Sequence, residues 1–323
     1  MKTTIFFLFV FTLFVGGCSN SSSPTTSKDI PNSWATESSI GFTPRWGLTS
    51  NEVGGKIYVI GGADMSSRGI PLSTLEVFDP QTNSWSTPVT TGTFTARRSH
   101  TSSVVGGKIY VIGGVDDTAR GALIPTVQVF DPLTNSWSTR TTTGTFTPRF
   151  GHSSCVVNGK IYIIGGEAGP VINTIDVFDP ATNTWSSPAT TGAFMPGEFL
   201  TSSFVNGKIF VMGGFGGGND KVMGVLDPQT NSWSIPTTKG TFTSRYGLTS
   251  DLVNSKMYVM GGTGKNTSNI VEIFDPASNT WSTPVTTGTF TVRSLHASSV
   301  VNGKIYVMGG TVLNTVEVFT PAP

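Results

Sequence analysis

Short apolar and polar segments alternate along most of the chain, and residues 146–187 show the pattern clearly. Four segments in this stretch have the character of β-strands: 153–157, 160–164, 174–178 and 183–187. Asn158-Gly159 separates the first two, and both residues suit the positive φ angles of a two-residue hairpin turn. Asp179-Pro180 begins a further turn, in which Asp can bond its own backbone. The pattern predicts four consecutive antiparallel strands.

This unit is repeated along the chain. The second apolar run of each unit ends in two glycines: Gly61-Gly62, Gly113-Gly114, Gly165-Gly166, Gly213-Gly214, Gly261-Gly262 and Gly309-Gly310. The spacings between these pairs are 52, 52, 48, 48 and 48 residues. Tryptophans follow Asn-Ser or Asn-Thr at Trp34, Trp85, Trp137, Trp185, Trp233 and Trp281. Such a period predicts an all-β propeller of four-stranded antiparallel blades.

The phase of the repeat predicts how its ends meet. The first marker, Trp34, has no diglycine before it, and the last, Gly309-Gly310, has no tryptophan after it. Residues 315–321 match the strand that elsewhere leads into Asn-Ser-Trp. We therefore expect the N-terminal strand to complete the last blade and to close a six-bladed β-propeller over residues 32–321.

The first 31 residues have a different composition. An uncharged, largely apolar run from Ile5 to Val15 is too short to span a bilayer and fits the core of a signal peptide. Val15-Gly16-Gly17-Cys18 resembles the lipobox of bacterial lipoproteins. The resemblance implies a signal peptide at 1–17, acylation of Cys18 and a polar tether at 18–31; Ser19 favours the outer over the inner membrane of the cell envelope. The alternative is an ordinary secretory signal with an incidental cysteine.

Composition limits the partners of the chain. A net charge of +1 and 12% charged residues give no electrostatic footprint for nucleic acid or for an anionic lipid surface. We expect no nucleic-acid partner, membrane contact through the lipid anchor only, and a monomer. With Cys18 acylated, Cys155 has no disulfide partner, and its apolar strand setting predicts a buried thiol.

The units resemble kelch repeats, whose markers are an apolar strand, a diglycine, an aromatic residue and, after six further residues, a tryptophan. That spacing holds for Phe78 and Trp85, Phe130 and Trp137, Phe178 and Trp185, and Phe274 and Trp281. Leu226 replaces the aromatic residue before Trp233, and phenylalanine stands where the family usually has tyrosine. The resemblance implies a β-propeller and covers most of the chain.

In an antiparallel meander, the loops between second and third strands lie on the same face as the junctions between fourth and first strands. We call this face the variable face, because its loops differ in length and sequence. The opposite face, here the uniform face, has the short Asn-Gly and Asp-Pro turns. An N-terminal fourth strand starts on the uniform face, so a lipid tether would attach there.

The junctions carry the candidate binding residues. Phe-Thr-x-Arg recurs at Arg45, Arg97, Arg149, Arg245 and Arg293, and a repeated arginine indicates a structural partner. The pattern fails once, at Gly197. The residue after the arginine, or after Gly197, differs in every unit; these six variable positions are Trp46, Arg98, Phe150, Glu198, Tyr246 and Ser294. Aromatic faces, a cation and a carboxylate around one mouth suit a sugar or an extended peptide. Asp64 and Asp116 in the neighbouring loops complete the predicted ligand-binding set, and neutral drift of exposed loops is the alternative.

Two comparisons with enzymes bear on catalysis. Galactose oxidase is related by fold, but here five of six tyrosines share one packing position, and His100, His152 and His296 share a position where other units have leucine. We therefore expect no metal and no cofactor. The chain is also similar in compartment and blade number to bacterial sialic acid mutarotases.

The mutarotase comparison would make Glu198 a base and Arg98 or Arg149 an anion clamp. Two hypotheses result. The first is a lipid-anchored module without catalytic residues that binds a protein or a glycan, and the second is a carbohydrate-active enzyme with its site at the same mouth.

Overall fold

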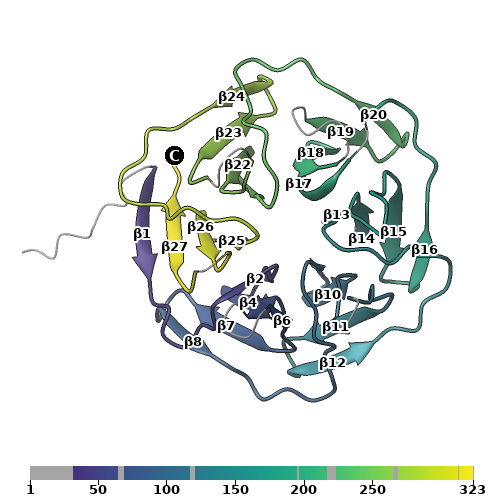
Figure 1. Ribbon diagram of the computed structural model, residues 1–323, viewed down its shortest axis with the longest axis vertical. Coiled ribbons are helices and arrows are strands. Elements are labelled where there is room, and N and C mark those ends of the chain that lie inside the picture. Colours follow the sequence, from purple (N-terminus) through teal and green to yellow (C-terminus); the bar gives the residue numbers. More distant parts are fainter. Residues whose placement is uncertain are drawn as a thin grey trace, which may run out of the picture.

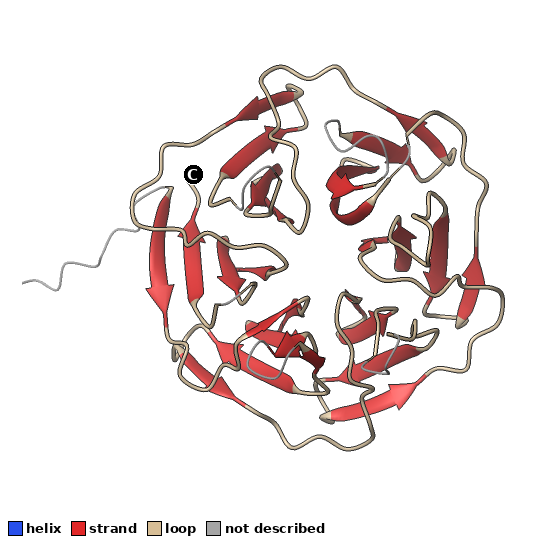
Figure 2. Ribbon diagram, in the orientation of Figure 1, coloured by secondary structure: helices blue, strands red, loops and turns tan. Residues whose placement is uncertain are grey.

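The computed structural model describes residues 32–64, 69–116, 121–194, 196–216, 223–264, 268–311 and 313–322. These residues form strands, turns and loops (Figure 2), which confirms the predicted all-β class. Within these ranges no helix is long and apolar enough to cross a membrane. The predicted signal peptide at 1–17, the tether at 18–31 and Cys18 lie outside the described residues.

Six four-stranded antiparallel sheets form from the described residues, and Figure 1 shows them arranged around a common central axis. The first strands, nearest the axis, are β3 (Thr49–Val53), β9 (Thr101–Val105), β13 (Ser153–Val157), β17 (Glu198–Val205), β21 (Thr249–Val253) and β25 (Ala297–Val301). The second strands are β4 (Lys56–Ile60), β10 (Lys108–Ile112), β14 (Lys160–Ile164), β18 (Lys208–Phe215), β22 (Lys256–Met260) and β26 (Lys304–Met308). We number the sheets 1 to 6 in this order.

The third strands are β7 (Leu75–Asp79), β11 (Val127–Asp131), β15 (Ile175–Asp179), β19 (Gly224–Asp227), β23 (Val271–Asp275) and β27 (Val316–Thr320). The fourth strands of sheets 1 to 6 are β8 (Ser84–Ser86), β12 (Ser136–Thr139), β16 (Thr184–Ser186), β20 (Ser232–Ser234), β24 (Thr280–Ser282) and β1 (Ser33–Glu37). A small additional sheet consists of β2 (Arg45–Trp46), β5 (Ala63–Asp64) and β6 (Ile70–Pro71).

The hydrophobic core lies between neighbouring sheets. The second and third strands have apolar residues on both faces, because both faces are covered by another sheet. One core cluster, for example, joins Ile60 and Leu75 of sheet 1 to Ile109 and Val111 of sheet 2. Each pair of neighbouring sheets therefore has its own layer of hydrophobic core between them.

The segments that link successive sheets protect the outer edges. Between sheets 1 and 2, the linker runs parallel to β12: Trp137 N–H donates to the Thr91 carbonyl over 2.9 Å, and Thr91 N–H donates to the Asn135 carbonyl over 3.0 Å. At Gly92, φ is +74° and a Cβ atom would lie 2.3 Å from the Trp137 carbonyl oxygen, so only glycine allows this approach. An outer strand covered in this way offers fewer free backbone groups to other chains.

The N-terminal strand β1 pairs with β27 near the C-terminus, with Ser33 opposite Thr320 and Glu37 opposite Val316. Trp34 lies between Phe290, whose ring is stacked at 4.2 Å, and Phe319, whose ring centroid is 4.9 Å away. Phe94 and Phe130 enclose Trp137 of sheet 2 in the same way. The N-terminal strand β1 thus supplies the tryptophan of sheet 6. In each of the other five sheets, the tryptophan comes from the strand that directly follows the third strand in the sequence.

We predict that Trp34→Ala lowers the free energy of unfolding by about 3 to 5 kcal/mol, because it removes a buried aromatic side chain between two rings. Chemical denaturation followed by circular dichroism measures this loss. Trp137→Ala is the matched control and should cost a similar amount. A much smaller loss for Trp34→Ala would show that β1 contributes little to the stability of the ring.

Candidate functional site

The six variable positions occupy equivalent places in the six sheets, at the start of the first strand or just before it. Each faces, across an antiparallel bridge or pair, the residue that follows the diglycine of the same sheet. The pairs are Trp46 and Ala63, Arg98 and Val115, Phe150 and Glu167, Glu198 and Phe215, and Tyr246 and Thr263. In sheet 6, the Thr311 N–H donates to the Ser294 carbonyl over 3.0 Å. The junctions and the loops after the second strands therefore meet on the variable face.

A ring of backbone hydrogen bonds lies directly beside these positions. The residue after each variable position donates its N–H to the carbonyl of the equivalent residue in the preceding sheet, over 2.5 to 2.9 Å. The six residues of this ring, here the mouth ring, are Gly47, Ser99, Gly151, Phe199, Gly247 and Leu295. The bond from Gly47 to Leu295 joins sheet 1 to sheet 6, so every described sheet takes part.

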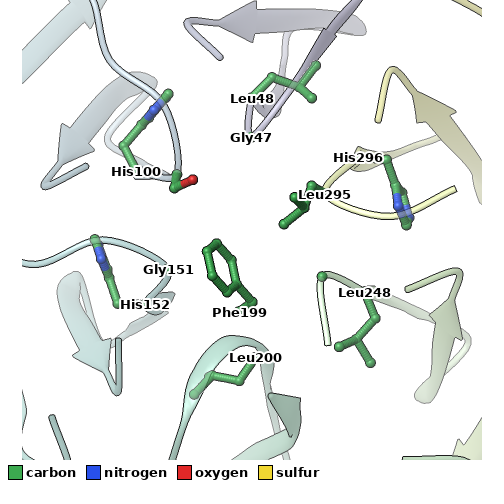
Figure 3. A pocket seen from close by; sticks show the side chains of 12 residues that line it. Gly47, Leu48, His100, Gly151, His152, Phe199, Leu200, Leu248, Leu295 and His296 are labelled. Atoms are coloured by element: carbon green, nitrogen blue, oxygen red, sulfur yellow. The ribbon is translucent and has the colours of Figure 1, made fainter. Parts of the chain in front are cut away.

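The mouth ring requires an unusual backbone conformation. Its three glycines have φ between 61° and 64°, while Ser99, Phe199 and Leu295 adopt φ of 54°, 52° and 54°. A non-glycine residue in this region costs about 1 to 3 kcal/mol. In Figure 3 the side chains of Phe199 and Leu295 extend towards the centre of the pocket that the ring lines. The ring lines this pocket and lies directly beside the variable positions.

Aromatic side chains form a connected cluster on one side of the mouth. The ring centroids of Phe150 and Phe199 are 5.9 Å apart, those of Phe199 and Tyr246 are 6.4 Å apart, and those of Phe215 and Tyr246 are 5.6 Å apart. Phe215 is 58% exposed, so part of this surface faces solvent. The cluster spans sheets 3, 4 and 5, and we call these four residues the aromatic cluster.

Elsewhere around the mouth, the guanidinium of Arg98 lies 4.9 Å from the centre of the Trp46 ring. This is cation–π geometry, and it joins the variable positions of sheets 1 and 2. Trp46 and Arg98 are both half-buried. The sequence predicted both residues as ligand contacts, and the structure additionally shows that they contact each other.

Glu198, at the variable position of sheet 4, is almost covered, with 9% of the residue exposed. Its carboxyl group is hydrogen-bonded to that of Glu167, which follows the diglycine of sheet 3. Burial raises the pKa of Glu198 to about 7, and the hydrogen bond to Glu167 and the negative charge of Glu167 act in the same direction. The second oxygen, Oε2, has no hydrogen-bond partner among the described residues. Glu198 therefore loses its proton at a higher pH than an ordinary glutamate does.

The repeated arginines are structural. Arg45, Arg149, Arg245 and Arg293 form buried ion pairs with third-strand carboxylates of their own sheets: Glu76, Asp176, Glu272 and Glu317. Each of these arginines also bonds the carbonyl of the first glycine in its diglycine. Arg97 makes the same bond to Gly113, but its side-chain partner is Gln128 rather than a carboxylate, at 2.6 Å. Burial lowers the pKa of Arg97 to about 10.

Arg149, predicted as one of two possible anion clamps, thus has an internal carboxylate partner already. Its side chain is fully buried and held by Asp176, so a ligand carboxylate would have to displace an internal partner. Of the groups considered for a carbohydrate-active enzyme, Glu198 and Arg98 lie on the variable face. They belong to sheets 4 and 2, and the partner of Glu198 is Glu167.

Sheet 4 lacks both members of the buried ion pair. Gly197 stands where the other sheets have arginine, and Gly224 stands where they have the acidic residue or glutamine. The ring of Phe194 fills the space, since a Cβ atom at Gly224 would lie 2.4 Å from it. Losing both partners together avoids an unpaired buried charge. Comparing the third strands of the repeats would have shown this joint loss from sequence.

The three histidines are packing residues beside the mouth ring. Nε2 of His100, His152 and His296 contacts a threonine hydroxyl of the preceding sheet at 3.1, 2.9 and 3.0 Å. Burial lowers the pKa of His152 to about 3. In Figure 3 the three side chains stand apart around the edge of the pocket. Among the described residues, no group of three or more His, Cys, Asp or Glu side chains could hold a metal ion.

The two predicted loop aspartates are involved in local structure. Asp116 accepts a hydrogen bond from Ala122 N–H over 3.0 Å, which closes its own loop. Asp64 lies opposite Arg45 in the backbone pairing of β5 with β2. Residues 65–68 and 117–120 of these loops lie outside the described residues.

Three residues at the mouth were missed in the sequence analysis: Phe199, Glu167 and Phe215. Phe199 stands where other units have Gly47, Ser99, Gly151, Gly247 and Leu295, and the other two follow the diglycine directly. A column-by-column comparison of the units would have singled out these positions.

The comparisons with known proteins agree with this architecture. A family model described as the KLHDC2/KLHL20/DRC7 Kelch-repeats domain matches residues 15–214 and 200–320. The chain belongs to this kelch-repeat family. The kelch fold accounts for the diglycines, the tryptophans and the four-stranded sheets.

Curated relatives include the Rab9 effector protein with kelch motifs of Bos taurus, 37% identical over 142 residues, or 42% of this chain and 37% of that protein. The Homo sapiens protein of the same name is 34% identical over 142 residues, with the same two shares. The F-box/kelch-repeat protein At1g22040 of Arabidopsis thaliana is 39% identical over 97 residues, covering 29% of this chain and 19% of that protein. The chain thus spans well under half the length of each of these relatives.

We predict that Arg149→Met lowers the free energy of unfolding by about 3 to 5 kcal/mol, because it leaves the Asp176 carboxylate buried without its cation. Lys160→Met is the matched control in the same sheet. Lys160 pairs with Asp179 at the surface, and its loss should cost at most about 1 kcal/mol. Equal losses in urea denaturation would contradict the structural role of Arg149.

Proposed function

We propose that this kelch protein is a binding module that holds a protein partner on its variable face. The observation that carries the proposal is the mouth itself. Aromatic and charged side chains that differ from sheet to sheet surround a backbone ring that is the same in all six sheets. Aromatic residues and arginine are the side chains that contribute most at binding surfaces.

A protein is the partner that the family favours. The relatives called Rab9 effector protein with kelch motifs carry in their name an action that involves another protein. A glycan is the other ligand that aromatic faces at a mouth could bind. The experiment below distinguishes the two.

We further infer that the six sheets are the blades of one closed six-bladed propeller, with β1 as the outer strand of the last blade. The pairing of β1 with β27 and the hydrogen bond from Gly47 to Leu295 support this inference. Both connections join the first unit of the chain to the last.

We also propose that Cys18 is acylated and anchors the protein in the bacterial cell envelope, at the outer membrane rather than the inner. The lipobox-like Val15-Gly16-Gly17-Cys18 and Ser19 support this proposal. Asn32 lines a hollow with Lys256 and Asp275, which lie beside short turns of the uniform face. A tether that leads to Asn32 would therefore leave the variable face pointing away from the membrane.

The partner-binding proposal is tested with the full chain as bait and with Phe150→Ala/Tyr246→Ala as the face variant. We expect a protein that the wild type retains to be lost from the variant. Leu133→Ser, which changes an exposed apolar side chain in an Asp-Pro turn of the uniform face, should retain it. Quantitative mass spectrometry of crosslinked complexes measures the amount of the partner retained by each variant relative to the wild type.

Equal retention by the face variant would contradict the proposal. Loss in the Leu133→Ser variant alone would place binding on the uniform face. A glycan-array signal that the face variant abolishes, without any retained protein, would replace the protein partner by a sugar.

Anchoring is tested by labelling cells that express the full chain with an alkyne fatty acid. The label should be present in the wild type and in Cys155→Ala, and absent from Cys18→Ala. Labelling that persists in Cys18→Ala would overturn the anchor, because Cys155 is the other cysteine of the chain and lies buried.

A further inference from the structure

The seam between sheets 3 and 4 carries an acidic site on the variable face. Glu198 is hydrogen-bonded to Glu167 there, and Oε2 of the nearly buried Glu198 has no hydrogen-bond partner among the residues that the structure describes. Neither carboxylate takes part in an ion pair among the described residues. Glu167 is half-buried, so it is the carboxylate that an incoming group meets first.

At this seam, the described residues of sheet 4 lack the buried arginine that the other five sheets have. In five of the sheets a buried arginine lies directly before the variable position, whereas Gly197 stands there in sheet 4. The acidic partner is also absent, because Gly224 replaces it. The part of sheet 4 that the structure describes therefore places no buried arginine beside the two glutamates.

Aromatic side chains adjoin both carboxylates. Phe150 lies directly opposite Glu167, and Phe215 lies directly opposite Glu198. Directly opposed residues of an antiparallel pair have Cβ atoms about 4.5 to 5.5 Å apart and point to the same face. Phe199 and Tyr246 connect the two phenylalanines through ring contacts. Each glutamate is therefore the cross-strand neighbour of one member of the aromatic cluster.

This combination is suited to an organic cation. Carboxylates supply charge and hydrogen-bond acceptors, and aromatic faces attract a cation through the ring quadrupole. A hard metal ion such as Ca²⁺ takes about six to eight oxygen ligands, whereas the aromatic cluster offers one hydroxyl, that of Tyr246. An arginine or lysine side chain, by contrast, can use both the acidic and the aromatic parts.

We propose that Glu167, Glu198 and the aromatic cluster bind a basic side chain, arginine or lysine, presented by the protein partner. The inference rests on the proposed function, and it specifies the chemistry of the contact. On binding, the cation takes the place of the proton on Glu198, and that proton is released to water.

The test uses the full chain and two small probes, N-acetyl-arginine methylamide and N-acetyl-lysine methylamide, with binding measured by ligand-observed NMR. The neutral control is N-acetyl-citrulline methylamide, which keeps the shape of arginine without its charge. We expect at least one cationic probe to bind about tenfold or more tightly than citrulline, as the loss of a charge-assisted hydrogen bond implies.

Glu198→Gln and Glu167→Gln should each weaken the cationic probe about tenfold. Glu52→Gln, at a hairpin turn of the uniform face, is the matched carboxylate control and should leave the affinity unchanged. Melting temperatures establish that the variants are folded. Affinity in the wild type should rise as pH increases through about 7, since Glu198 must lose its proton to take the cation.

The groups acting on Glu198 are the Glu167 carboxyl and the burial of its own side chain; Tyr246 is the other titratable group in the cluster. The pH dependence should therefore vanish in Glu198→Gln. Equal affinity for arginine, lysine and citrulline probes, or unchanged affinity in both glutamine variants, would overturn the inference. A partner that is lost from Phe150→Ala/Tyr246→Ala but retained by both glutamine variants would overturn the inference and leave the proposed function in place.

Discussion

Six backbone hydrogen bonds connect the sheets of this kelch protein around the mouth of its central channel. Each bond joins one sheet to the next, and the bond from Gly47 to Leu295 joins the first sheet to the last. The ring residues all have positive φ, and three of them are not glycine. That conformation is retained because neighbouring sheets hold each residue from both sides. The variable positions beside the ring can therefore differ without moving the scaffold.

Buried arginines give a second layer of order beneath the mouth. In sheets 1, 3, 5 and 6, an arginine joins the diglycine carbonyl to a third-strand carboxylate. These contacts tie the junction of a sheet to its second and third strands. Sheet 4 replaces them with apolar packing of Phe194 against Gly224. Among the described residues, sheet 4 thus has no buried arginine at this corner, where Glu198 lies against Glu167.

Much of the fold was predictable, because its signals are local. Turn residues with positive φ, such as Asn158, and alternating strands such as 174–178 are set within a few residues. The predicted site was less complete. Trp46, Phe150 and Tyr246 do lie on the mouth, but Arg149 is buried against Asp176, and Phe199 and Glu167 were missed. Their contacts depend on partners in other strands or sheets.

The amino-acid sequence by itself determined the repeated strands, their phase and the face on which the variable loops meet, since all three follow from periodicity and strand direction. Only the tertiary structure decided which side chains act together. Glu198 is an ordinary carboxylate in its own strand, and its pKa rises because burial removes water and sheet 3 brings Glu167 against it. A contact between two sheets depends on their packing, which periodicity within one unit does not describe.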